Sequence, residues 1–84
     1  MPYIKKEDRL RLDKWIDESG ALTEGELNYV FTRLLLNSNP QERHYKDWNA
    51  LIGVLEACKL EFYRRRVAPY EDDAIKRNGD INDV

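Results

Sequence analysis

The stretch LTEGELNYVFTRLL, residues 22–35, contains the clearest helix signal in the chain. Thr23 stands three residues before Glu26, the spacing of a capping box in which each side chain binds the backbone of the other residue. Apolar residues then recur every three or four positions, as on one face of an α-helix: Leu27, Val30, Phe31, Leu34 and Leu35. We expect this helix to end within Asn37–Pro40, because proline cannot continue it.

A helix is also predicted on the N-terminal side, over residues 7–18. Its apolar stripe is formed by Leu12, Trp15 and Ile16, and the first turn carries acidic residues that suit the positive end of the helix dipole. Gly20 supplies the stop, since glycine tolerates the left-handed conformation that ends many helices.

The longest predicted helix lies on the C-terminal side, from about residue 45 to residue 66. Two apolar stripes run along it, so it can pack against two neighbours at once. Pro69 is expected to close it. Residues 70–77 can then form a short fourth helix that ends at Asn78–Gly79.

Length and composition place these helices in one small domain, residues 1–84. The chain has a mass of 10.0 kDa, with 42% hydrophobic and 36% charged residues. We therefore predict an all-α fold: a compact bundle of three main helices plus a short C-terminal helix, with residues 80–84 as a frayed tail. A chain of this size buries only about 60% of the surface that it exposes when unfolded. Its core would be thin, and oligomerisation is expected to complete it.

Charge and cysteine content exclude several classes of protein. The net charge of −2 and the pI near 5.4 argue against a dedicated nucleic-acid binder. A single cysteine, Cys58, rules out an internal disulfide and most cysteine-based metal sites. No apolar run approaches a membrane span, and the N-terminus has no signal-peptide pattern. These features predict a soluble cytoplasmic protein.

The candidates for catalytic chemistry are few, and we expect no enzymatic activity, cofactor or metal. His44 lies in a polar link, and Cys58 lies on a helix, where cysteine usually behaves as a small hydrophobic residue. The sequence has no glycine-rich phosphate loop. Its acidic pairs, Asp13 with Asp17 and Glu56 with Glu61, lack the i, i+3 spacing of helical magnesium sites.

Residues 59–66, here called the basic cluster, are the most conspicuous candidate site. They include Lys59, Arg64, Arg65 and Arg66 against one acid, Glu61. These cations can simply complement the C-terminal end of a helix dipole. Alternatively, at most two of the arginines can bind one phosphate or carboxylate, with Tyr63 stacking on a ring.

An acidic segment, residues 71–84, follows the basic cluster and holds five acids against two bases. Its first residues, Glu71–Asp73, can pair with the arginines of the same chain or of another copy. In the first case the arginines would be structural, and exposed pairs of this kind stabilise a protein by about 0–1 kcal/mol each.

The second helix offers further candidates in Asn28, Tyr29 and Arg33, which lie on or beside its apolar stripe. They can bond to a neighbouring helix or line a cleft with Lys59 and Tyr63. The two tryptophans, Trp15 and Trp48, are interpreted as core or subunit-interface residues.

Several motifs give the chain a resemblance to known sequences over nearly its whole length. They are ELNY (26–29), TRL (32–34), NALIGVLE (49–56), KLEFYRR (59–65), VAPYED (67–72) and NGD (78–80). With these motifs the chain resembles an uncharacterised family of short proteins from bacteriophages and bacterial genomes. The resemblance implies a phage or prophage setting and carries no established activity.

That setting, with the basic cluster, leads to two hypotheses. In the first, a non-enzymatic homo-oligomer sequesters a small anionic ligand, such as a cyclic signalling nucleotide, in anti-defence. Lys59, Tyr63, Arg64 and Arg65 would bind it, with Asn28, Tyr29, Arg33 and Tyr70 as secondary candidates. In the second, the protein is a homo-oligomeric adaptor that binds other proteins and has no small-molecule ligand.

Overall fold

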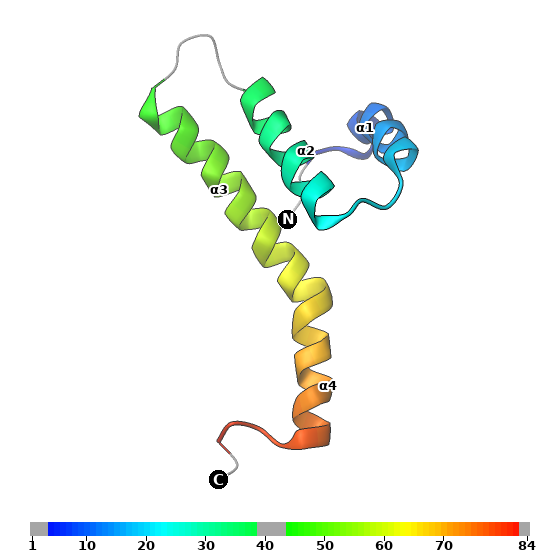
Figure 1. Cartoon of the computed structure of the whole chain (residues 1–84), viewed down its shortest axis with the longest axis vertical. Coiled ribbons are helices and arrows are strands. Elements are labelled where there is room, and N and C mark those ends of the chain that lie inside the picture. Colours follow the sequence, from blue (N-terminus) through cyan, green and yellow to red (C-terminus); the bar gives the residue numbers. More distant parts are fainter. Residues whose placement is uncertain (1–3, 39–43, 83–84) are drawn as a thin grey trace. The chain divides into compact units, whose positions relative to one another are not determined.

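The computed structural model describes residues 4–38 and 44–82, which are helical over most of their length (Figure 1). The elements in chain order are α1 (Lys6–Ser19), α2 (Glu24–Asn37), α3 (Tyr45–Phe62), the π-helical turn η1 (Tyr63–Val67) and α4 (Ala68–Asn78). No strand occurs in the described residues, and the all-α prediction is confirmed. The chain divides into two units, residues 1–38 (unit 1) and 39–84 (unit 2).

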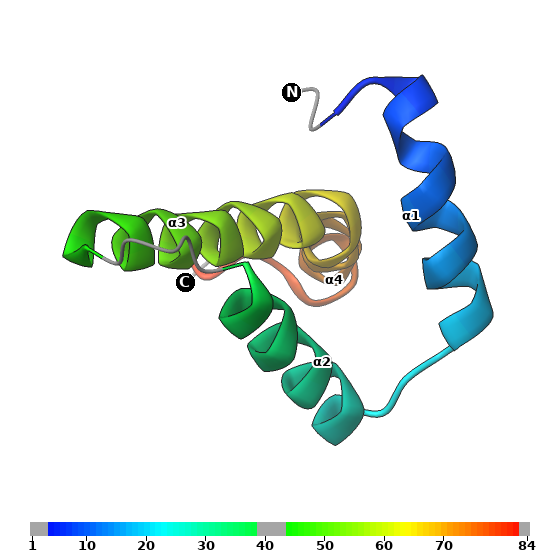
Figure 2. The same ribbon diagram turned by 90° about the horizontal axis from the view of Figure 1, so that it is seen from above.

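Unit 1 contains α1 and α2, joined by the extended link over residues 20–23 (Figure 2). The predicted capping box is present at the start of α2. The Glu26 backbone N–H donates to Thr23 Oγ1 at 3.2 Å, and the Thr23 N–H donates to Glu26 Oε1 at 2.9 Å. α1 ends at Ser19, and the following residue, Gly20, has a positive φ of 63°, as the sequence predicted. α2 ends at Asn37, while Pro40 lies outside the described residues.

Unit 2 corrects the prediction that Pro69 closes the long helix. α3, η1 and α4 follow one another without a break, and Pro69 lies in the first turn of α4 (Figure 1). A proline inside an α-helix lacks a donor and its ring clashes with the carbonyl four residues earlier. Here the preceding turn is widened, and the Ala68 N–H donates to the carbonyl of Tyr63, five residues earlier. The helix therefore passes the proline instead of ending there.

The end of unit 2 follows the sequence more closely. α4 stops at Asn78, and Gly79 has a positive φ of 83° with its N–H bound to the Ile75 carbonyl at 2.8 Å. This is the helix end that Asn78–Gly79 predicted. Residues 80–82 are not helical, and residues 83–84 lie outside the described part of the chain.

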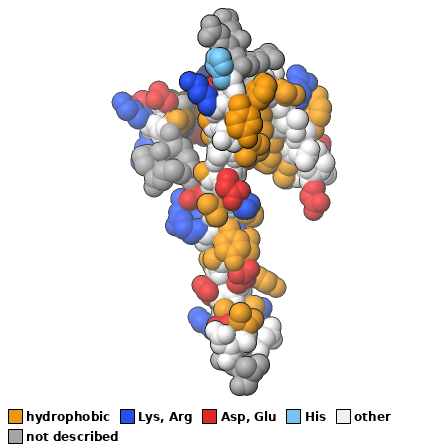
Figure 3. Space-filling view, turned by 90° about the vertical axis from the view of Figure 1, so that its left-hand side faces the viewer, with side chains coloured by type: hydrophobic (Ala, Val, Ile, Leu, Met, Phe, Trp, Pro, Cys, Tyr) orange, Lys and Arg blue, Asp and Glu red, His pale blue; other side chains and the backbone are white. Residues whose placement is uncertain are grey.

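The apolar stripes lie on the helices where they were predicted, but they are not covered. Among the described residues, no side chain is buried in the single chain. Trp15 and Trp48 are each 48% exposed, and Phe62 is 64% exposed. In Figure 3, apolar side chains lie at the surface between charged ones along the C-terminal helix. The residues expected to form a core are thus available to contact other molecules.

Candidate functional site

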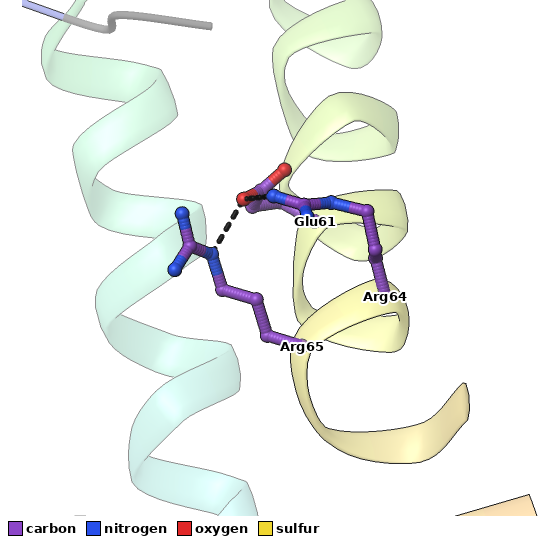
Figure 4. A network of polar contacts seen from close by, with 3 residues as sticks. All are labelled: Glu61, Arg64 and Arg65. Atoms are coloured by element: carbon purple, nitrogen blue, oxygen red, sulfur yellow. Dashed lines mark hydrogen bonds and ion pairs between the residues drawn. The ribbon is translucent and has the colours of Figure 1, made fainter. Parts of the chain in front are cut away.

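The centre of the basic cluster is a carboxylate that binds two arginines (Figure 4). Arg64 Nη2 and Arg65 Nε each lie 2.5 Å from the same oxygen, Oε1 of Glu61. Glu61 lies in the last turn of α3 and the arginines lie in η1, three and four residues later. Residues at these spacings are neighbours on a helix surface, so local geometry alone brings the charges together.

These contacts change the ionisation of Glu61. Hydrogen bonds from Arg64 and then Arg65 lower the pKa of the Glu61 carboxyl from 4.5 to about 2. Both guanidinium groups bind the charged carboxylate better than the neutral acid, and this lowers the pKa. Glu61 is therefore ionised throughout the physiological pH range.

The other cations of the basic cluster differ in their pairing. Lys59 Nζ lies 2.9 Å from Glu56 Oε1, one turn earlier on α3, and both side chains are largely exposed. Arg66 makes no ion pair within the described residues. The cluster is thus a mixed surface, in which neighbouring carboxylates offset much of the positive charge.

Tyr63 contacts the acidic segment rather than a cation. Its hydroxyl donates to Glu71 Oε2 at 2.5 Å, across the π turn. The hydrogen bond to Glu71 raises the pKa of the Tyr63 hydroxyl, because an anionic acceptor favours the protonated phenol. On α4, the Arg77 guanidinium lies over the Tyr70 ring, 5.8 Å from its centroid. Both tyrosines therefore lie against neighbours in their own helix.

The secondary candidates from the second helix form a separate group in unit 1. Arg33 Nη1 donates to the Tyr29 hydroxyl at 2.9 Å, and the same guanidinium lies 5.8 Å from the Tyr29 ring centroid. The Asn28 carbonyl accepts a hydrogen bond from Thr32 Oγ1 at 2.8 Å. These residues belong to α2, whereas Lys59, Tyr63, Arg64, Arg65 and Tyr70 belong to unit 2.

Two partners in these contacts had not been identified from the sequence. Glu61 was not predicted to pair with the arginines, although its spacing to Arg64 and Arg65 is the one that forms helix ion pairs. Arg77 stands seven residues after Tyr70, two helical turns along the same face, and had not been considered. Helical spacing was the available signal in both cases.

Within the cluster, two guanidinium groups bind a carboxylate of their own chain. Two guanidinium groups converge on one carboxylate oxygen, as they would on one oxygen of a phosphate. Glu61 itself occupies this position, so an external anion would compete with it. The pairing also shows that two of the three consecutive arginines can share one partner.

Within residues 4–38 and 44–82, no group of three His, Cys, Asp or Glu side chains is placed to hold a metal ion. The helices described here are also too short or too polar to cross a membrane. Cys58 is exposed on α3, and the backbone N–H of His44 donates to Asp47 Oδ2 at 3.1 Å at the start of that helix.

Comparison with known proteins extends the resemblance noted in the sequence. The model of a family described as Domain of unknown function (DUF6899) matches residues 1–81. No curated protein and no solved structure matches the chain. The match spans nearly the whole sequence and agrees with the expectation of an uncharacterised family. The chain therefore belongs to the family described as Domain of unknown function (DUF6899).

Proposed function

We propose that this chain is a non-enzymatic interaction protein of the cytoplasm, which self-associates through its apolar helix faces and can present them to other proteins. One observation carries the proposal. No described side chain is buried, yet the helices carry apolar stripes that include both tryptophans and Phe62. Exposed apolar surface of this kind marks protein–protein contacts.

Leaving these stripes in water costs free energy. Covering apolar surface stabilises a protein by about 25 cal/mol per Å². Aromatic side chains bury about 150–250 Å² each and are enriched in interfaces. A second copy of the chain offers the same stripes, so association covers both sets at once.

The test is sedimentation velocity of the full-length protein over a wide concentration range. We expect a defined oligomer whose population grows with concentration. Replacing an exposed apolar residue by a charged one, Phe62→Glu, is expected to weaken association, whereas Ile81→Glu, outside the helices, serves as the matched control. A protein that stays monomeric at every concentration would overturn the proposal.

Capture of a small anionic ligand, such as a signalling nucleotide in anti-defence, is a second candidate. It is favoured by the convergence of Arg64 and Arg65 on one oxyanion beside Tyr63. In this role the Glu61 carboxylate would stand where a phosphate oxygen binds. An arriving phosphate would have to displace it.

Native mass spectrometry of the protein purified from cells tests this candidate, followed by denaturation and analysis of released small molecules. A discrete nucleotide-sized mass would support ligand capture. The Arg64→Ala, Arg65→Ala variant should then lose the ligand, while Glu61→Gln should bind it more tightly because the competing charge is gone. Unchanged affinity in the double alanine variant would exclude this site.

A further inference from the structure

The charges along residues 61–76 are ordered in mirror fashion about the Ala68–Pro69 bond. For each charged residue on one side of the bond, a residue of opposite charge stands the same number of positions away on the other side. The matched pairs are Arg66 with Glu71, Arg65 with Asp72, Arg64 with Asp73 and Glu61 with Lys76. Every charged residue of the segment takes part, and basic and acidic side chains are visible along this helix in Figure 3.

An apolar stripe in the same segment has the same symmetry. Tyr63, Val67, Tyr70 and Ala74 follow one another at spacings of four, three and four residues, and inversion about the Ala68–Pro69 bond exchanges Tyr63 with Ala74 and Val67 with Tyr70. The Tyr63 hydroxyl donates to Glu71, and the Arg77 guanidinium lies over the Tyr70 ring, so each tyrosine of the stripe has one charged neighbour in its own chain. Tyr63 is 44% exposed and Tyr70 is 66% exposed, so the stripe is open to a partner.

We propose that two copies of this chain pair antiparallel along residues 61–76, with the two-fold axis at Ala68–Pro69. The inference rests on the proposed self-association and names its surface. The apolar stripes of the two copies would meet, with Val67 and Tyr70 on either side of the two-fold axis. Residues 64 and 71 flank the stripe on one edge, and residues 66 and 73 flank it on the other.

In this antiparallel pair, the edge that carries residues 64 and 71 faces the same edge of the partner. The edge that carries residues 66 and 73 likewise faces its counterpart. Arg64 then lies beside the partner's Glu71, and Arg66 lies beside the partner's Asp73. A parallel arrangement would instead set the arginines of one copy beside those of the other, and like charges would repel. The charges therefore select the direction and register of pairing, while the apolar stripe provides the contact area.

Arg66 and Asp73 provide the sharpest test, because neither makes an ion pair or side-chain hydrogen bond within the described residues. The variants Arg66→Glu and Asp73→Lys each put like charges together at both ends of the proposed dimer. We expect each variant alone to dissociate about tenfold more readily than the wild type. An equimolar mixture of the two should recover the wild-type association, because each introduced charge then meets its opposite.

Sedimentation velocity on the full-length variants, separately and mixed, gives the readout, and circular dichroism checks that each remains helical. The pair Arg64→Glu and Glu71→Lys repeats the test on the other edge. Lys14→Glu on α1 makes the same charge change outside the segment and should leave association unchanged. Recovery in the mixture supports this surface, since a change confined to one chain would not be repaired by the other.

The two proposals fail in different ways. An oligomeric wild type whose variants associate normally, or whose mixture shows no recovery, overturns the antiparallel surface and leaves self-association standing. The same result would point to another face, such as the stripe that contains Trp48. A monomeric wild type overturns both proposals.

Discussion

At the scale of single residues, Glu61 is the group whose ionisation reports directly on the basic cluster. Its pKa is lowered to about 2 because Arg64 and Arg65 bind the carboxylate, against an ordinary value of 4.5. A carboxyl whose pKa is lower in the folded state stabilises the fold above its ordinary pKa. That contribution is lost as the pH falls from about 4.5 toward about 2.

We therefore expect the Arg64→Ala, Arg65→Ala variant to raise the pKa of Glu61 toward its ordinary value. Titration of the side-chain carboxyl by carbon NMR measures this directly. Arg66→Ala is the matched control, because it removes a neighbouring arginine that does not contact Glu61. A Glu61 pKa that stays near 2 in the double variant would show that these two contacts are not its cause.

Some of these residue contacts follow from sequence and some do not. The ion pairs of Glu61 span three and four residues, so helical spacing predicts them once the helix is known. The hydrogen bond from Tyr63 to Glu71 spans eight residues and crosses η1. Its geometry depends on the wider π turn, which sequence spacing did not indicate.

At the scale of elements, the start of α2 depends on Thr23. We expect Thr23→Ala to destabilise the protein by about 1 kcal/mol, because the Glu26 N–H loses its acceptor. Unfolding in urea, followed by circular dichroism, measures the loss. Thr32→Ala is the matched control within the same helix, since its hydroxyl donates to the carbonyl of Asn28 and alanine is the better helix former. Equal losses in the two variants would contradict a capping role for Thr23.

The π turn is expected to depend on Pro69. The variant Pro69→Ala restores the backbone N–H and removes the ring that would clash with the carbonyl of Arg65 in an ideal α-helix, so an unbroken α-helix becomes possible. We expect the Ala68 N–H to leave the Tyr63 carbonyl and to bind the carbonyl of Arg64, four residues earlier. Scalar couplings across backbone hydrogen bonds, measured by NMR, distinguish these two acceptors. A coupling to Tyr63 that persists in the variant would show that other residues hold the turn open.

The bounds of the helices could be predicted from the sequence to different degrees. α2 has its cap, its apolar period and its end within one short stretch, so its bounds followed from the sequence. The helix over residues 45–78 passes a proline that sequence rules treat as a stop, and only the structure shows the widened turn that admits it. Local signals fix where helices begin, while the way in which a helix accommodates a proline depends on the backbone around it.

At the scale of the whole molecule, the exposed stripes link folding to association. A state that forms only on association is stabilised by higher protein concentration, because mass action favours the associated form over the unfolded chain. We expect the thermal midpoint of the wild type to rise over about a hundredfold increase in concentration. The Arg66→Glu variant should show a smaller rise, because its association is weaker.

The dependence of the thermal midpoint on concentration also distinguishes the two proposed roles. Self-association links the midpoint to protein concentration even when no ligand is present, whereas capture of an anion links it to ligand concentration. Added inorganic phosphate should therefore leave the wild-type midpoint nearly unchanged if Arg64 and Arg65 serve mainly to bind Glu61. A thermal midpoint that rises with phosphate in the wild type but not in the Arg64→Ala, Arg65→Ala variant would instead favour anion capture. A midpoint that does not depend on protein concentration would count against self-association. Differential scanning calorimetry at several protein and phosphate concentrations, with chloride at matched ionic strength as the control, distinguishes these outcomes.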